Sequence, residues 1–335
     1  MRKKSYTTLV GAAAVIAALL AAGVGSASPS KGYKIYLLPK NLGNPYFDAS
    51  NKGAQKAAKE LGDTVTFNAP TEASAAKQVA FINTAVSQGY NAIIISGNDP
   101  NAVAPALKRA KARGVKILSY DADVAADARL VYVSLPDLKA VGEAQVEWLG
   151  SQIGYKGEFA ILSAAATAAN QNAWIKYMKL ALKKPKYRNM KLVKTVYGDD
   201  NDAKSAQLAQ GLLQAYPNLR GIIAPTTVGI AASARVVQQA KVCNKVRVTG
   251  LGLPSQMRSY VKSNCVKKFG LWNVEDLGYV AVYTANAILA GKITGKNGDT
   301  FTAGKAGKRQ VGPKGVMIGV PPFAFTKANI DQFKF

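Results

Sequence analysis

The chain has 335 residues, with 44 Lys and Arg against 19 Asp and Glu (a formal net charge of +25) and 48% hydrophobic residues. This length and apolar content indicate a globular chain of one or two domains with a buried core. The sequence contains no His, which excludes His-dependent catalytic triads, His general bases and His-ligated zinc sites.

The first 27 residues predict a signal for export. Arg2, Lys3 and Lys4 precede an apolar, Ala-rich run over 9–24, and small residues follow as far as Ala27. A retained membrane anchor is the alternative, but the run is short for a membrane span. We therefore expect an exported protein in the periplasm or on the outer face of the cell envelope, cleaved near Ala27. No Cys lies near that junction, so we expect no lipid anchor.

From Tyr33 onward, strand-like runs alternate with amphipathic helical patterns. The first predicted strand is Lys34–Leu38. The helix after it, Pro45–Leu61, has Asn44 as its N-cap and Gly62 as its stop. The further predicted strands are 64–68, 92–96, 115–120 and 130–134, then 158–163, 191–197, 221–224, 247–251 and 268–272. The further predicted helices are 74–88, 101–113, 137–153, 171–183, 202–216, 228–240, 255–263 and 275–290.

This alternation predicts an α/β fold with two doubly wound parallel-sheet lobes, each built on about five strands. Breaks in the alternation predict three crossings between the lobes, near 135–138, 271–273 and 300–305. The expected domains are 32–135 plus 273–300 for the N-terminal lobe and 136–272 plus 301–335 for the C-terminal lobe. The helix over 275–290 should then pack on the first lobe.

Polar residues follow the predicted strands, where open parallel sheets bind ligands. The first series gives Lys40, Asn44, Asp99, Asp121 and Asp123, with the rings of Tyr46 and Phe47 beside them. The second series gives the segments SAAATAANQN, GDDND and APTTVG, and then Trp272 and Asn273. All of these residues would converge on one cleft if the two lobes face each other.

The spaced carboxylates of GDDND do not predict a calcium site, because the segment lacks the Gly and Glu that follow in a calcium loop.

Carboxylates and aromatic rings in one cleft are typical of a sugar site. Asp121 can accept hydrogen bonds from two hydroxyls, while Trp272 and Phe47 can cover the C–H faces of the sugar. We expect Asp121 to be the main anchor and to be exposed in the ligand-free protein. The alternatives are that Asp121 only caps a turn, that Trp272 packs at the hinge, and that Phe47 is core, with Tyr46 facing the ligand.

Cys243 and Cys265 lie in turn-like segments that precede candidate strands. Two thiols in an oxidising compartment often pair, so we predict a disulfide between them. Two free buried thiols are the alternative.

Eight segments of the sequence match the motifs of one protein family. They are PKNLGNPYF (39–47), QGYNAIIISGNDPNAVAPALKRA (88–110), AANQNAW (168–174), VYGDD (196–200), IIAPTTVGIAA (222–232), GLGLPSQM (250–257), FGLWNVEDLGY (269–279) and FTKANIDQFKF (325–335). With these motifs the chain resembles the type I periplasmic solute-binding proteins of ABC importers, closest to the branches that bind rhamnose and autoinducer-2.

The resemblance implies a hinged two-lobe sugar-binding protein that acts with a membrane ABC permease and is a monomer. It implies no catalytic residue, no metal and no cofactor. The expected ligand-binding residues, including those already named, are Lys40, Asn44, Tyr46, Phe47, Asp99, Asp121, Asp123, Asn170, Gln171, Trp174, Pro225, Thr227, Trp272 and Asn273.

At two positions the chain departs from the autoinducer-2 branch, and both departures favour the rhamnose branch. The autoinducer-2 branch is expected to have a carboxylate where this chain has Asn170, and a small residue where it has Thr227. Leu253 and Pro254 stand where many pentose and hexose binders carry an Asp. We therefore expect a rhamnose-like deoxysugar, with the furanosyl signal autoinducer-2 as the alternative.

Other functions fit less well. An exported glycosidase would need two carboxyls flanking a bond, and Asp121 and Asp123 are the candidates on an extended segment. A sugar-responsive repressor would need a DNA-reading helix pair in place of the export signal. The Lys residues are scattered over many helices, so we expect a solvated surface and no nucleic-acid partner.

Overall fold

The computed structural model describes residues 32–134, 136–317 and 321–335. The predicted signal peptide, 1–27, lies outside these residues, as does the first residue of the crossing predicted at 135–138. Within the described residues, no helix is both long enough and apolar enough to cross a membrane.

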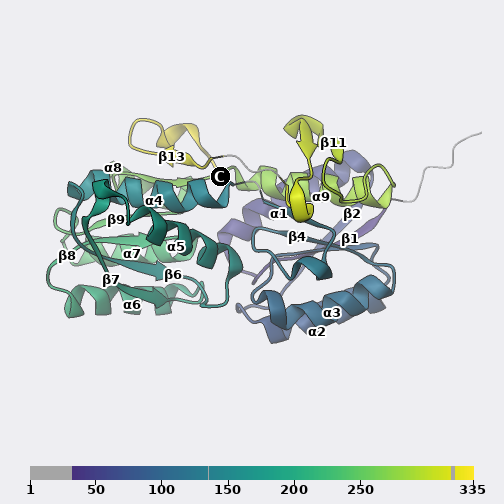
Figure 1. The fold of residues 1–335 in the computed structure, drawn as a ribbon, viewed down its shortest axis with the longest axis horizontal. Helices are drawn as coiled ribbons and strands as arrows, with labels where there is room; N and C mark the ends of the chain where they lie inside the picture. The colour runs from purple at the N-terminus through teal and green to yellow at the C-terminus, as the bar shows by residue number, and fades with distance from the viewer. Residues whose placement is uncertain (1–31, 135, 318–320) are drawn as a thin grey trace, which may run out of the picture. The chain divides into compact units, whose positions relative to one another are not determined.

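The first lobe is built on a five-stranded parallel sheet with the order β2-β1-β3-β4-β5. Its strands are β1 (Lys34–Leu38), β2 (Thr64–Phe67), β3 (Ala92–Ile95), β4 (Lys116–Tyr120) and β5 (Val131–Val133). Its helices are α1 (Pro45–Leu61), α2 (Ala75–Ser87), α3 (Pro100–Ala112) and α9 (Val274–Leu289). Helices α1 and α9 cover one face of the sheet, and α2 and α3 cover the other (Figure 1).

Alternation along the strands explains these two layers. Ile35 and Leu37 of β1 are buried in the core on the side of α1 and α9, whereas Tyr36 and Leu38 are buried against α2 and α3. Successive side chains of a strand point to opposite faces, so a continuous apolar strand is buried on both sides.

The second lobe is built on a four-stranded parallel sheet with the order β7-β6-β8-β9. Its strands are β6 (Lys156–Ser163), β7 (Asn189–Tyr197), β8 (Leu219–Ala224) and β9 (Arg247–Gly250). Its helices are α4 (Leu138–Ile153), α5 (Ala169–Ala181), α6 (Asp202–Ala215), α7 (Thr227–Gln239) and α8 (Pro254–Lys262). Helix α4 packs with α5, and α6 packs with α7 (Figure 1). Two doubly wound parallel-sheet lobes are therefore present, as predicted.

The fifth strand predicted for the second lobe pairs elsewhere. Strand β10 (Phe269–Leu271) meets the main sheet at one bridge, between Leu251 and Gly270. Its regular partner is β13 (Phe323–Phe325), with which it forms a two-stranded antiparallel sheet. The sequence around 325 carries no strand pattern long enough to have predicted this partner.

The expected boundary at 300/301 is wrong for residues 301–317. Strands β11 (Thr300–Thr302) and β12 (Lys308–Gln310) form a Gly-rich antiparallel hairpin rather than a crossing. Farther along, the Met317 amide donates to the Tyr132 carbonyl of β5 (2.9 Å), and Arg129 Nη1 donates to the Lys314 carbonyl (3.0 Å). These residues therefore contact the first lobe, and β13 is the first later strand that pairs in the second lobe.

The connections between the main elements also contain short 3₁₀ helices: η1 (Ala126–Ala128), η2 (Pro185–Tyr187), η3 (Gly304–Ala306), η4 (Pro313–Gly315) and η5 (Ile330–Gln332).

Helix α9 packs on α1, in the first lobe, as predicted. Two glycines allow the helices to touch. A Cβ at Gly53 would lie 1.7 Å from the Glu275 carbonyl oxygen, and one at Gly278 would lie 1.9 Å from the Ser50 carbonyl oxygen. A segment from late in the sequence thus completes the layer beside β1.

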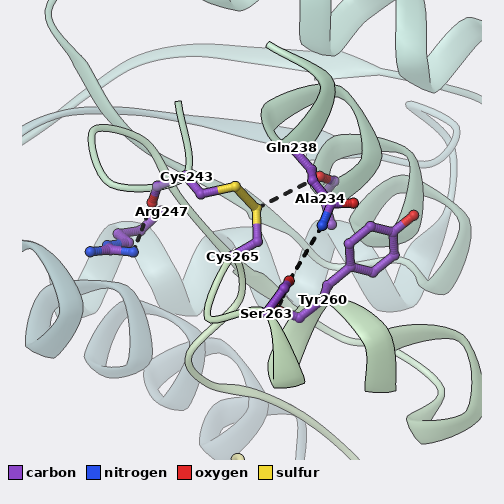
Figure 2. The surroundings of a disulfide bond; sticks show 7 residues. All are labelled: Ala234, Gln238, Cys243, Arg247, Tyr260, Ser263 and Cys265. Atoms are coloured by element: carbon purple, nitrogen blue, oxygen red, sulfur yellow. Dashed lines mark hydrogen bonds between the residues drawn. A yellow bond between two sulfur atoms is a disulfide. The ribbon is translucent and has the colours of Figure 1, made fainter. Parts of the chain in front are cut away.

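Cys243 and Cys265 are joined by a disulfide in the structure (Figure 2), with their Cα atoms 4.8 Å apart. Cys243 lies between α7 and β9, and Cys265 lies between α8 and β10. Both precede a strand, so the bond is at the end of the lobe opposite the carboxyl ends of its strands.

We expect thiol counting on denatured, unreduced protein to find no free thiol. Replacing both Cys by Ser should lower the free energy of unfolding by about 3 kcal/mol, the effect typical of a loop of this size, as measured by urea titration. Affinity for the ligand should not change, because the bond is remote from the strand ends that bind it. Two free thiols per chain in the unreduced protein would contradict the pairing.

Candidate ligand-binding site

A cavity lies between the carboxyl ends of strands from both sheets. Its free volume is about 30 Å³, room for about one or two water molecules, so a monosaccharide would need a wider form of this cavity. Its lining residues are Lys40, Asn44, Tyr46, Phe47, Asp121, Asn170, Gln171, Trp174, Asp200, Pro225, Thr226, Thr227, Leu251, Leu271 and Trp272. All but three of the predicted ligand-binding residues are among them.

Asp121 is held on several sides. It follows β4 with a left-handed backbone (φ 56°). Its Oδ1 accepts from the Tyr46 hydroxyl (3.1 Å) and from Asn170 Nδ2 (3.1 Å). Its Oδ2 accepts from Ser96 Oγ (2.7 Å) and lies 3.6 Å from Lys40 Nζ. The side chain is only 6% exposed, so the expectation of an exposed carboxylate was wrong.

Asn170 of the second lobe contacts both charges of this ion pair. Besides donating to Asp121, it accepts from Lys40 Nζ at 3.4 Å. A third bond between the lobes runs from Trp272 Nε1 to the Tyr46 hydroxyl (3.2 Å). Polar groups that a sugar could bind are therefore bonded to one another here, and a ligand would exchange these bonds for its own.

Aromatic rings form much of the cavity wall. Tyr46 meets Phe47 and Trp272 edge to face, with ring centroids 5.1 and 6.2 Å apart, and Trp174 lies 5.9 Å from Trp272. Trp174 Nε1 is buried and has no hydrogen-bond partner among the described residues. An unpaired buried donor costs free energy, so a ligand oxygen in the cavity would stabilise this site. Phe47 lines the cavity and also packs on Tyr120 in the core of the first lobe.

The hydroxyl of Tyr46 stays protonated. Burial raises its pKa well above the ordinary range, and the neighbouring Asp121 carboxylate raises it further. Tyr46 can therefore only act as a neutral hydrogen-bonding group, which suits an uncharged ligand.

Gln171 of the second lobe is held in place by two hydrogen bonds. Gln171 Oε1 accepts from Ser163 Oγ and from the Ala164 amide (2.7 Å). Pro225 and Thr226 form the turn between β8 and α7, and Thr227 is the first residue of α7.

Asp99 and Asn273 do not line the cavity, because each caps a helix. Asp99 accepts from the first amides of α3 (2.9 and 3.0 Å), and Asn273 accepts from those of α9 (3.1 and 3.3 Å). The structure does not bring either side chain to the predicted site.

Asp123 is also absent from the cavity lining. Its carboxylate forms a two-pronged ion pair with Arg129, with Nε–Oδ1 at 2.6 Å and Nη2–Oδ2 at 2.7 Å, and also accepts from Ser119 Oγ (2.6 Å). The left-handed backbone of Asp121 breaks the extended segment on which Asp121 and Asp123 were expected to face one way. These two carboxylates thus have different partners and do not form a pair.

The sequence reasoning missed four lining residues: Asp200, Thr226, Leu251 and Leu271. Asp200 lies in GDDND, which was placed at the cleft but not assigned a role in binding. The signal that could have found it is its place just beyond the end of β7. Leu251 directly follows β9 and Leu271 ends β10, but their apolar side chains gave no signal of a polar site.

A sequence model of the family described as "Periplasmic binding protein domain" matches residues 35–293. This match covers most of the chain, so the chain belongs to the periplasmic binding protein family.

Similar solved structures indicate the kind of ligand that this class of protein binds. A sugar ABC transporter protein from Actinomyces odontolyticus is 45% identical, with 90% of this chain and 98% of that chain covered and a TM-score of 0.72. A solute-binding protein from Clostridium phytofermentas with bound L-rhamnose is 35% identical, with the same coverage and a TM-score of 0.87. LsrB from Clostridium saccharobutylicum in complex with AI-2 is 27% identical, with 90% and 100% covered and a TM-score of 0.85.

The chain is therefore a solute-binding protein of sugar ABC transport. Proteins of this kind bind and deliver their ligands rather than transform them, so the chain is not an enzyme. Membership of the periplasmic family also implies export from the cytoplasm.

Proposed function

We propose that the protein binds one monosaccharide, a deoxysugar of the L-rhamnose type, in the cavity between its lobes and delivers it to a membrane permease. The observation that carries this proposal is the Asp121 carboxylate, buried in the wall of a cavity otherwise rich in aromatic rings. Sugars combine hydroxyl rims with C–H faces, and a charged acceptor beside rings meets both.

Asn170 supports a rhamnose-type ligand over autoinducer-2. Its amide donates to Asp121 Oδ1 at 3.1 Å. A second carboxylate at this position, as expected in the autoinducer-2 branch, would face Asp121 as a like charge unless it carried a proton. The bound L-rhamnose of the Clostridium phytofermentas protein, which is 35% identical, favours the same reading. Autoinducer-2 remains the alternative, because LsrB, at 27% identity, was solved with AI-2.

The proposed cycle is a hinge closure. Residues 32–134 with 273–317, and 136–272 with 321–335, would move as two lobes, and a bound sugar would stabilise the closed form. We further propose that residues 1–27 are a cleaved signal, that the mature protein has no lipid anchor, and that it acts as a monomer with its permease.

A thermal-shift panel tests the ligand. Protein refolded from denaturant, to remove any carried sugar, is melted with L-rhamnose, L-fucose, D-ribose, D-glucose and AI-2. We expect the largest rise in Tm with L-rhamnose, since a ligand at 100 times its Kd stabilises the native state by about 2.7 kcal/mol. Calorimetry should give one site per chain. A shift with AI-2 alone would favour the alternative, and a panel without any shift would contradict monosaccharide binding.

A further inference from the structure

The two lobes each place an aspartate with a left-handed backbone just beyond a strand. Asp121 (φ 56°) follows β4 directly, and Asp200 (φ 51°) follows β7 by three residues. Both line the cavity. Positive φ is uncommon outside glycine, and Asp is among the few residues that tolerate it. The second lobe thus brings its own carboxylate to the cavity that holds Asp121.

The two carboxylates differ in how much of their hydrogen-bonding capacity is used. Asp121 has three hydrogen-bond donors and the Lys40 ammonium around it. Asp200 Oδ1 accepts from Thr226 Oγ1, and the described residues supply no other hydrogen bond or ion pair to its side chain. A carboxylate offers about four acceptor positions, so most of the capacity of Asp200 is left for a ligand.

The positive charge near Asp200 does not fully balance the negative charge of its carboxylate. Burial raises its pKa above the ordinary value, Asp121 and Asp199 add to this, and Lys40 and the Thr226 hydroxyl oppose it. Lys40, however, is already paired with Asp121. A half-buried carboxylate without its own cation is stabilised by neutral O–H donors, which a sugar supplies.

We propose that Asp200 is a further ligand-binding residue, which accepts hydrogen bonds from sugar hydroxyls on the edge opposite the one held by Asp121. This inference rests on the proposed function and narrows the ligand class to neutral sugars with hydroxyls on both edges. Asp200 then selects against sugars that lack a hydroxyl on the second-lobe edge, because such a sugar leaves a half-buried acceptor unpaired.

Asp199 provides a matched control. It has the same left-handed backbone (φ 54°), but its carboxylate pairs with Lys204 at the surface and does not line the cavity. We expect Asp200→Asn to raise the Kd for the preferred sugar about 10- to 100-fold by calorimetry, and Asp199→Asn to change it less than twofold. Asn keeps the shape and tolerates positive φ, so both variants should melt near the unmutated protein.

A pH series adds a readout that a merely structural role would not change. Because the pKa of Asp200 is raised, acidification should protonate it above the ordinary aspartate range, and sugar affinity should fall as pH decreases through that raised pKa. In Asp200→Asn this part of the pH dependence should disappear, leaving the profile due to the other groups.

The outcomes separate this inference from the proposed function. If Asp200→Asn binds like the unmutated protein, Asp200 is not a ligand residue, whereas sugar binding itself stands. If the unmutated protein binds no sugar, the proposed function fails first. Should Asp200→Asn fold poorly, Asp200→Gly replaces it, since Gly adopts positive φ freely, and the same loss of affinity is required.

Discussion

Replacing Asp121 by Asn is expected to raise the Kd for the bound sugar by tenfold to a thousandfold. A hydrogen bond to a charged group is worth about 1.5–3 kcal/mol, and each factor of ten in Kd corresponds to about 1.4 kcal/mol. The substitution keeps the shape of the side chain but removes the charge opposite Lys40, and it turns one acceptor into a donor that faces other donors.

Calorimetry on Asp121→Asn with the preferred sugar is the decisive measurement. The melting temperature of the ligand-free variant should also fall, because Asp121 is buried and accepts from Tyr46, Ser96 and Asn170. Affinity is therefore compared at a temperature where both proteins are folded. An unchanged Kd would make Asp121 a turn residue, and the site would lose its central member.

Asp123→Asn is expected to give the opposite pattern: a large loss of stability with sugar affinity kept. Its partner Arg129 has a side chain only 2% exposed. Without the carboxylate, the guanidinium would remain buried as an unpaired charge, and breaking such a pair costs about 3 kcal/mol. The cost appears in the folded state only, so urea titration should show a lower midpoint with an unchanged slope.

Asp127 gives the control for this experiment. It pairs with Lys108 at the surface, and its side chain is 68% exposed. Exposed pairs contribute about 0–1 kcal/mol, so Asp127→Asn should leave the midpoint nearly unchanged. If Asp123→Asn instead weakens sugar binding as Asp121→Asn does, while remaining fully stable, the structural role of the Arg129 pair is refuted.

The fold could be predicted in outline because central strands such as β1, β3 and β4 are buried on both faces. Continuous apolar runs such as β3 stand out between helical patterns and define βαβ units. The edges of the sheets were less predictable. Strand β10 has a strand-like sequence, but its partner β13 is three residues long and comes more than 50 residues later, so only tertiary structure identifies the pair.

The site followed from the same rule that places ligands at strand ends. The rule could not decide whether a polar residue at a strand end faces the ligand, caps a helix or pairs with another side chain. Asp99 and Asn273 begin helices whose free amides need an acceptor, and Asp123 meets an arginine six residues farther on. Asp200 was placed at the cleft with the rest of GDDND, but the sequence does not distinguish it from its neighbour Asp199, which pairs with Lys204 at the surface.

The contact between α1 and α9 also sets a time order for folding during synthesis. Gly53 and Gly278, where the helices approach closely, are 225 residues apart in the chain. Ribosomes add about 5–20 residues per second, so roughly 11–45 s separate the two. Until α9 has been made, the sheet of the first lobe has apolar residues such as Ile94 and Leu118 open on one face. The second lobe, whose main sheet ends at Gly250, can complete that sheet first although it begins later in the sequence.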